Sequence, residues 1–279
     1  MTVLVTGARG DVGAAVLAGL LAAGEPVRAS SRAPRPGEFP AGVEVARADL
    51  ADPASWPAAL AGMRKVFLYA HSEGAAEFAT AARKAGIEHV VLLSSSTVLY
   101  PDAEASPIAV RHIAAERALE EAGLDRTFVR PGYYATNALR WWQSIRTGRV
   151  LRTAFPDAVT SPVHERDIAQ VAVRALLDDR HRGAACPVLG AGPVTVREQV
   201  AAIAGALGEP VRLEEVDVDT YRAQLLTQLP RPIVERVLQD RGSVPPLPAE
   251  LATDAVPEIL GRPALTFAEW ARDHAADFR

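Results

Sequence analysis

The feature that most constrains this chain is a loop of spaced glycines near its amino end. The loop, Gly7-Ala8-Arg9-Gly10-Asp11-Val12-Gly13, stands between a short apolar run at 2–6 and an amphipathic stretch at 14–23. This order predicts a strand, a tight turn and a helix. Glycines let such a turn approach a pyrophosphate, whose charge sits on free N–H groups at the helix amino end. The loop therefore predicts a dinucleotide site, and a glycine turn without a ligand is the alternative.

The alternation of strand and helix patterns continues through the first half of the chain. Further strands are predicted at 27–30, 43–46, 66–69, 90–93 and 126–129. Helices are predicted at 74–85 and 108–122. The run Val90-Val91-Leu92-Leu93 does not alternate with polar residues, which is typical of strands covered on both faces. These patterns predict an α/β fold with a doubly wound parallel Rossmann sheet.

Beyond residue 133 the pattern is looser. It predicts helices at 135–147 and 167–177 and strands at 159–163 and 187–189. Two T-x-x-E capping boxes, Thr195 with Glu198 and Thr266 with Glu269, predict helix starts. We expect a nucleotide-binding domain at 1–150. We expect the segment 151–279 to complete the sheet and to form a small C-terminal α/β substrate lobe, with 211–257 as a cap over the carboxyl edge of the sheet.

Composition narrows the classes of protein that remain. The 279 residues carry a formal net charge of −4 with no basic cluster, which argues against direct nucleic-acid binding. No apolar run reaches the roughly 20 residues that cross a bilayer, and the start lacks a secretory signal, so we expect a cytoplasmic protein. The single cysteine and six scattered histidines show no metal-ligand spacing, so no metal is expected. The Ala-, Arg- and Pro-rich composition is typical of a bacterial source.

The end of the second predicted strand, Ser30-Ser31-Arg32, indicates which nucleotide is bound. NAD-selective domains usually carry an acid at this place to hold the ribose 2′-hydroxyl. Arg32 instead offers a forked cation for a 2′-phosphate, with Ser31 as a neutral donor and Arg9 assisting from the glycine loop. Solvated surface arginines are the alternative. The pattern favours NADP(H) over NAD.

Two further short segments are candidates for cofactor contact. Asp49-Leu50 follows the third predicted strand, where its carboxylate would lie beside the adenine or would only form a turn. Ala70-His71 follows the fourth strand at the carboxyl edge, where a small residue lets a cofactor approach. His71 is equally well explained as an ordinary loop residue.

Taken together, five segments resemble the NmrA-like, atypical branch of the short-chain dehydrogenase/reductases. They are Val3–Gly13, Asp49-Leu50, Leu93-Ser94-Ser95-Ser96, Arg130-Pro131-Gly132 and Val163–Ala169. The resemblance implies an NADP-preferring Rossmann domain with a small C-terminal lobe. Members include quinone-type, ether or imine reductases and redox-sensing regulators. It also places Ser94, Pro131, Gly132 and Tyr133 beside the cofactor.

Active relatives carry a serine at the end of strand five and a Tyr-x-x-x-Lys pair on the next helix. Ser96 matches the serine, but Ile108 stands at the tyrosine position and His112 at the lysine position. His112 can still hydrogen-bond a nicotinamide ribose or relay a proton. Tyr100 is a candidate acid from the loop. A helix-surface role for His112 and ordinary packing for Tyr100 are the alternatives.

Aromatic residues after the Arg-Pro-Gly turn are candidates for the substrate pocket. The resemblance places Tyr134, Trp141 and Trp142 along its wall, which would suit flat, apolar substrates. Helix packing is the alternative for the two tryptophans, and as helix neighbours they cannot both face one pocket.

These observations leave three functions open. The first is an NADP(H)-dependent oxidoreductase acting on an aromatic or conjugated carbonyl or quinone-type small molecule. The second is a catalytically silent NADP(H) sensor that acts through a protein partner. The third is a non-redox cyclase or dehydratase on the same fold. A monomer or homodimer is expected in each case.

Overall fold

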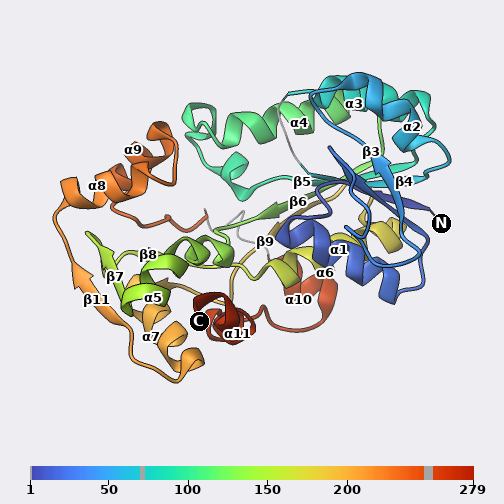
Figure 1. Ribbon diagram of the computed structural model, residues 1–279. Coiled ribbons are helices and arrows are strands. Elements are labelled where there is room, and N and C mark those ends of the chain that lie inside the picture. The colour runs from blue at the N-terminus through green and yellow to red at the C-terminus, as the bar shows by residue number, and fades with distance from the viewer. Residues whose placement is uncertain (1, 70–72, 248–253) are drawn as a thin grey trace. The chain divides into compact units, whose positions relative to one another are not determined.

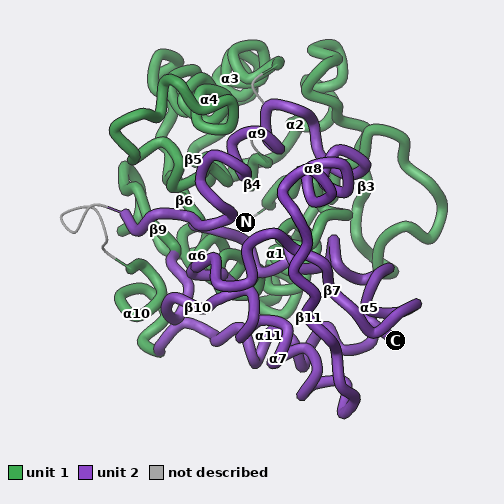
Figure 2. Tube along the Cα trace, turned by 90° about the vertical axis from the view of Figure 1, so that its left-hand side faces the viewer, with its two compact units in different colours: residues 1–131, 165–188, 249–262 green, residues 132–164, 189–248, 263–279 purple. Residues whose placement is uncertain are grey.

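A computed structural model describes residues 2–69, 73–247 and 254–279 of the chain. Ala70 and His71, predicted to contact the cofactor, lie outside these ranges. The chain forms two compact units, coloured separately in Figure 2. Unit 1 comprises Met1–Pro131, Glu165–Val188 and Ala249–Arg262, and unit 2 comprises Gly132–His164, Leu189–Pro248 and Pro263–Arg279. The sequence predicts a single division near residue 150, whereas the chain passes between the units several times.

Unit 1 is built on a seven-stranded parallel sheet with the order β3-β2-β1-β4-β5-β6-β9. The strand order reverses beside β1, which makes the carboxyl ends of β1 and β4 the switch point where such sheets bind ligands. The doubly wound α/β fold is therefore confirmed. The strands are β1 (Val3–Val5), β2 (Val27–Ser31), β3 (Glu44–Arg47), β4 (Lys65–Tyr69), β5 (His89–Leu93), β6 (Arg126–Pro131) and β9 (Ala185–Val188).

Helices cover both faces of this sheet, as Figure 1 shows. Helices α2, α3 and α4 lie on one face, where Trp56 meets Phe78 edge-on at 4.8 Å between ring centroids. Helices α1, α6 and α10 lie on the other face. Their bounds are α1 (Asp11–Ala22), α2 (Trp56–Leu60), α3 (Ala75–Lys84), α4 (Ala109–Glu121), α6 (Glu165–Leu177) and α10 (Ala255–Leu260), with short 3-10 helices at η1 (Pro53–Ser55), η2 (Ser96–Leu99), η3 (Ala103–Ala105) and η5 (Asp179–His181).

Unit 2 packs two small sheets and several helices around a core that contains Phe267 and Trp270, stacked at 4.9 Å. Strand β8 pairs antiparallel with β10, and β7 pairs parallel with β11. The strands are β7 (Val150–Thr153), β8 (Val159–Thr160), β10 (Val194–Thr195) and β11 (Arg212–Glu215). The helices are η4 (Ala135–Trp141), α5 (Trp142–Gly148), α7 (Val196–Leu207), α8 (Val218–Leu226), α9 (Arg231–Gln239), α11 (Phe267–Asp273) and η7 (Ala275–Phe278).

Several predicted elements of unit 2 differ in the structure. The helix expected at 135–147 is a 3-10 helix followed by the short α5, and β7 and β11 were not predicted. The strand expected at 159–163 ends at Thr160, since Pro162 lacks the N–H that a ladder needs. Both capping boxes are confirmed: Thr195 accepts from the Glu198 amide and Thr266 from the Glu269 amide.

Within the described ranges, no helix has the length and apolar character needed to cross a membrane. The same ranges contain no cluster of three or more histidine, cysteine or acidic side chains placed to hold a metal ion.

Candidate nucleotide-binding and active site

The glycine loop turns tightly between β1 and α1, and Gly13 is required by the loop itself. A Cβ atom at Gly13 would lie 2.1 Å from the Gly7 carbonyl oxygen, far inside van der Waals contact. Gly7 has a positive φ of 61°, which favours glycine. Ala8 and Val12 are buried, whereas Asp11 is exposed in the first turn of α1.

Gly10 has no such internal reason to be glycine. It is the N-cap of α1 with φ −81° and ψ 162°, which any residue adopts, and, as a glycine, it has no side chain to cap the helix. A Cβ atom there would meet only the Gly7 carbonyl oxygen, at an ordinary 3.4 Å. The bare, exposed backbone at this helix start therefore fits a pyrophosphate approaching the N–H groups of the first turn.

The end of β2 carries an arrangement that the sequence did not indicate. Glu38, from the β2–β3 loop, accepts a hydrogen bond from the Ser31 hydroxyl at 3.3 Å and pairs with Arg9 Nη1 at 3.1 Å. Arg32 is exposed and makes no ion pair with a residue that the structure describes. Two of the three side chains predicted to hold a 2′-phosphate thus hold a carboxylate of the same chain.

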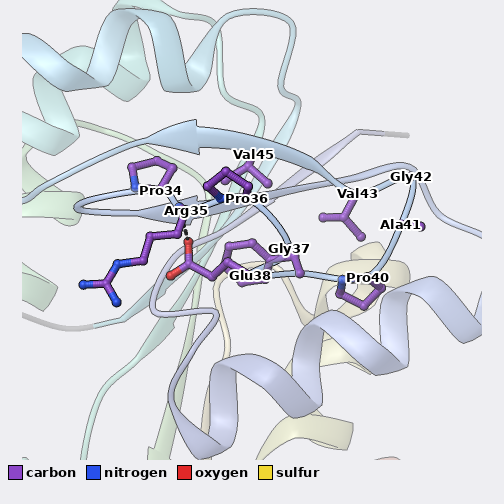
Figure 3. A pocket seen from close by; sticks show the side chains of 11 residues that line it. Pro34, Arg35, Pro36, Gly37, Glu38, Pro40, Ala41, Gly42, Val43 and Val45 are labelled. Atoms are coloured by element: carbon purple, nitrogen blue, oxygen red, sulfur yellow. Dashed lines mark hydrogen bonds between the residues drawn. The ribbon is translucent and has the colours of Figure 1, made fainter.

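The β2–β3 loop folds back on itself around a hollow of about 610 Å³. Figure 3 shows the side chains that line it, all from 34–43 and Val45, with the Glu38 carboxylate directed at the backbone of Arg35. The Arg35 amide donates to Glu38 Oε2 at 3.2 Å. None of the predicted catalytic residues lines this hollow.

Asp49 and Leu50 occupy the turn after β3. The Asp49 carboxylate accepts from the Ala51 amide at 3.1 Å, which is the turn-forming role weighed for it. Leu50 packs against the core of unit 1. A contact of either residue with adenine stays a prediction.

A buried polar network connects the carboxyl ends of β5 and β6 to α4. The Ser94 hydroxyl donates to Glu116 Oε1 at 2.6 Å, and Arg130 grips both carboxylate oxygens of Glu116 at 2.9 and 2.7 Å. Ser94 and Glu116 are buried, so the network holds α4 against the sheet. The sequence alone did not indicate this pairing, because Glu116 and Arg130 stand 14 positions apart on different elements.

His112 lies one turn before Glu116 on the same face of α4, and its Nδ1 atom has no hydrogen-bond partner among the described residues. This atom is buried and makes no hydrogen bond to a described residue. Burial lowers the pKa of His112, with Arg111 adding to the effect and Glu116 opposing it. The ring is therefore held in its neutral form, with one nitrogen able to bond a ligand hydroxyl. An orphaned polar atom of this kind fits a bound ribose.

The remaining candidate catalytic residues lie on the loop after β5. Ser95 caps η2 by accepting from the Thr97 amide, and Ser96 is buried as the first residue of η2. Tyr100 follows η2; burial raises its pKa, and Asp102 adds to the rise. Ser94, Ser96 and His112 thus belong to neighbouring elements of unit 1, since α4 packs against η2. The cofactor contact of Ser94 and the catalytic roles of Ser96, His112 and Tyr100 stay predictions.

Pro131 ends β6, and Gly132 and Tyr133 begin unit 2. The Val163 amide donates to the Tyr133 carbonyl at 2.6 Å. Burial raises the pKa of the Tyr133 hydroxyl, which hydrogen-bonds Arg140 and Asn137.

The predicted wall residues of the substrate pocket lie in different surroundings. Tyr134 is half-buried at the start of η4. Trp141 packs against the core of unit 2, whereas Trp142 is 45% exposed. As adjacent positions imply, the two tryptophans face different ways.

Comparison with known proteins identifies the family. Residues 7–179 match the profile of the family described as NAD(P)H-binding. The chain belongs to this family. A Streptomyces griseus relative, (4-alkanoyl-5-oxo-2,5-dihydrofuran-3-yl)methyl phosphate reductase, is 39% identical over 280 residues, covering 99% of each chain. An NAD(P)H azoreductase of Xenophilus azovorans is 34% identical over 286 residues, again 99% of each.

Solved structures agree on the fold of this NAD(P)H-binding protein. The triphenylmethane reductase of Citrobacter sp., complexed with NADP(H), matches with a TM-score of 0.77 and 22% identity over 99% of this chain and 100% of that one. The predicted resemblance and the predicted use of a nicotinamide cofactor are confirmed at the level of NAD(P)H binding. With near full-length reductase relatives, the chain is an NAD(P)H-dependent oxidoreductase.

Proposed function

We propose that the chain uses NADPH to reduce a small molecule whose carbonyl, quinone or azo group is conjugated. The observation that carries this proposal is the buried Nδ1 of His112, which has no partner in the part of the chain that the structure describes and which lies at the position of the missing lysine. The names of the two full-length relatives support the substrate class, since one acts on an oxo-dihydrofuran with an alkanoyl substituent and the other on an azo compound.

The chain's own residues suffice to hold the nucleotide. The bare backbone at Gly10 and the amino end of α1 would receive the pyrophosphate, and Arg32 would face a 2′-phosphate. The neutral His112 ring would hydrogen-bond a ribose hydroxyl through Nδ1. When bound, the cofactor supplies a hydride.

The missing Tyr-Lys pair restricts the acceptor. Ile108 stands where the tyrosine would be; it is apolar, caps the start of α4 and is 40% exposed, so it cannot deliver a proton. A conjugated acceptor spreads the charge that it gains and does not require a strong acid in the same step. Ser96 and Tyr100 are the hydroxyl groups in this part of unit 1 that we assign to hydrogen-bonding the acceptor oxygen.

The test is NADPH oxidation by the purified protein with a 4-alkanoyl butenolide phosphate, a naphthoquinone, an azo dye and a simple ketone. We expect turnover with at least one conjugated acceptor and none with the ketone. His112→Ala should lower kcat/KM about 100-fold or more, the low end of what a positioned side chain contributes in acid–base catalysis. His181→Ala, in η5 at the opposite end of the strands, is the matched control and should leave the rate unchanged.

Two outcomes would contradict the proposal. Tight NADPH binding without turnover on any acceptor would favour the sensor function. Conversion of a substrate in the absence of nicotinamide nucleotide would favour the cyclase or dehydratase function.

A further inference from the structure

Glu38 lies where the predicted donors for a 2′-phosphate meet. Its Oε1 atom faces both the Ser31 hydroxyl, at 3.3 Å, and Arg9 Nη1, at 3.1 Å, while Oε2 accepts from the Arg35 amide at 3.2 Å. The Glu38 side chain is only 9% exposed, against 47% for Arg9. The carboxylate is thus enclosed by its donors rather than solvated at the loop surface, as Figure 3 shows for its bond to Arg35.

We propose that Glu38 determines the nucleotide selectivity of this site. Its carboxylate contacts the donors that a 2′-phosphate would use, Arg9 and Ser31. It accepts a hydrogen bond from the 2′-hydroxyl of NADH and must leave Arg9 and Ser31 when NADPH binds. This inference rests on the proposed nucleotide use and deepens it. Glu38 thereby allows the chain to bind both NADH and NADPH, with a smaller preference for NADPH than Arg32 and Arg9 alone would produce.

The charges require this competition. A carboxylate and a phosphate repel one another, and one guanidinium with one hydroxyl cannot satisfy both at hydrogen-bond distance. A ribose hydroxyl, by contrast, donates to a carboxylate, which is how acidic residues at this place favour NAD. Arg32, exposed and without a described ion-pair partner, stays available to attract the phosphate while Glu38 is displaced.

The loop that carries Glu38 can release it without disturbing the sheet. The contacts of Glu38 named above are to the loop itself, to the end of β2 and to the glycine loop. The strand pairs of β2 with β3 do not include it, since they begin at Arg28 and Glu44. A purely structural role for Glu38 would instead alter stability and change the affinity for every nucleotide alike.

The experiment compares the wild type with Glu38→Gln, which keeps the shape of the side chain and removes its charge. Calorimetric titration uses two probes that differ only in the 2′-phosphate, 5′-AMP and adenosine 2′,5′-bisphosphate, and fluorescence titration uses NADH and NADPH. We expect the affinity ratio of the phosphorylated to the unphosphorylated member of each pair to rise about tenfold, the factor that 1.4 kcal/mol of binding free energy produces. An affinity ratio within twofold of the wild type would overturn the inference.

Glu44→Gln is the matched control. Glu44 pairs with Arg28 at 2.7 Å on the adjoining strands and is 60% exposed, so this variant removes the same charge nearby without touching Ser31 or Arg9. The affinity ratio of Glu44→Gln should equal that of the wild type. If it rose as much as the ratio of Glu38→Gln, the effect would come from the net charge of this region, and the inference would be overturned. Because the AMP probes carry no hydride, this readout is independent of turnover. A failed acceptor panel would count against the proposed reaction alone.

Discussion

Arg130 and Glu116 form a two-point ion pair between β6 and α4, with Nε 2.9 Å from Oε1 and Nη2 2.7 Å from Oε2. Their side chains are 17% and 9% exposed, so both charges are largely removed from water. The pair fixes the helix that carries His112, and Ser94 joins it through the same carboxylate. The geometry of the candidate active site therefore depends on it.

Glu116→Ala should be strongly destabilising. It leaves the Arg130 guanidinium buried without its counter-charge, which costs about 3–5 kcal/mol in comparable cases. Urea unfolding measures the change. The control is Glu88→Ala, because Arg64 and Glu88 form a similar two-point pair, with Arg64 60% exposed. That variant should lose less than about 1 kcal/mol. Equal losses of unfolding free energy in the two variants would show that burial of the Arg130–Glu116 pair does not determine its contribution to stability.

Two alanine substitutions in the glycine loop should affect different properties: Gly13→Ala should lower stability, and Gly10→Ala should lower the affinity for NADPH. Gly13→Ala places a Cβ atom 2.1 Å from the Gly7 carbonyl oxygen and should cost about 1–3 kcal/mol of unfolding free energy or more, as overpacking does. Gly10→Ala meets only an ordinary contact and should cost less than about 1 kcal/mol, the effect of a poor N-cap. It should nevertheless weaken NADPH binding at least about tenfold by blocking the pyrophosphate. Unchanged NADPH affinity in Gly10→Ala would contradict the placement of the pyrophosphate at the start of α1.

The strand and helix pattern of unit 1 could be predicted from the sequence because each element repeats a local signal. Buried parallel strands such as β5 are continuous apolar runs, and the glycine loop marks its own turn. Strand β11 has no such signal: Arg212-Leu213-Glu214-Glu215 is half exposed and charged, and it is a strand only because β7 lies beside it.

The two most informative side-chain contacts of the site also depend on tertiary structure, so the sequence could not predict them. Glu38 reaches Arg9 and Ser31 only because its loop folds back, and Glu116 meets Arg130 across two elements. No regular spacing or motif in the sequence indicates either ion pair. The position of His112 in the family pattern makes it a candidate from sequence, but only the fold shows that its Nδ1 is buried without a partner among the described residues.

Cys186 should be inert toward thiol reagents in the folded protein. It is 5% exposed on β9, and burial, with Glu258 adding, raises its pKa to about 11. At pH 8 only about one molecule in a thousand would carry the reactive thiolate. Labelling by an aromatic disulfide should be slow in buffer and should rise with urea in parallel with unfolding. Rapid labelling of the native protein would contradict the burial of this thiol.

His89 should make stability depend on pH in a defined window. Thr127 Oγ1 donates to the His181 carbonyl at 2.6 Å and so receives its bond from His89 Nε2, at 2.9 Å. The His89 Nδ1 atom is buried without a partner among the described residues, so a proton added there would have no acceptor. Burial, with the charge of Lys65, lowers the pKa of His89 from 6.5 to about 4.

Because the folded pKa lies below the unfolded one, the unfolded chain binds the proton first as pH falls. The contribution of His89 to stability is complete above pH 6.5 and is lost progressively between 6.5 and about 4, by about 3 kcal/mol in total. His89→Gln should flatten the dependence of unfolding free energy on pH between 6.5 and 5, measured by urea titration at several pH values. The control is His181→Gln, which also removes an imidazole but keeps the backbone carbonyl that accepts from Thr127. Its unfolding free energy should depend on pH as steeply as that of the wild type. A wild-type slope in His89→Gln would show that other groups, such as the paired carboxylates, account for the whole pH dependence.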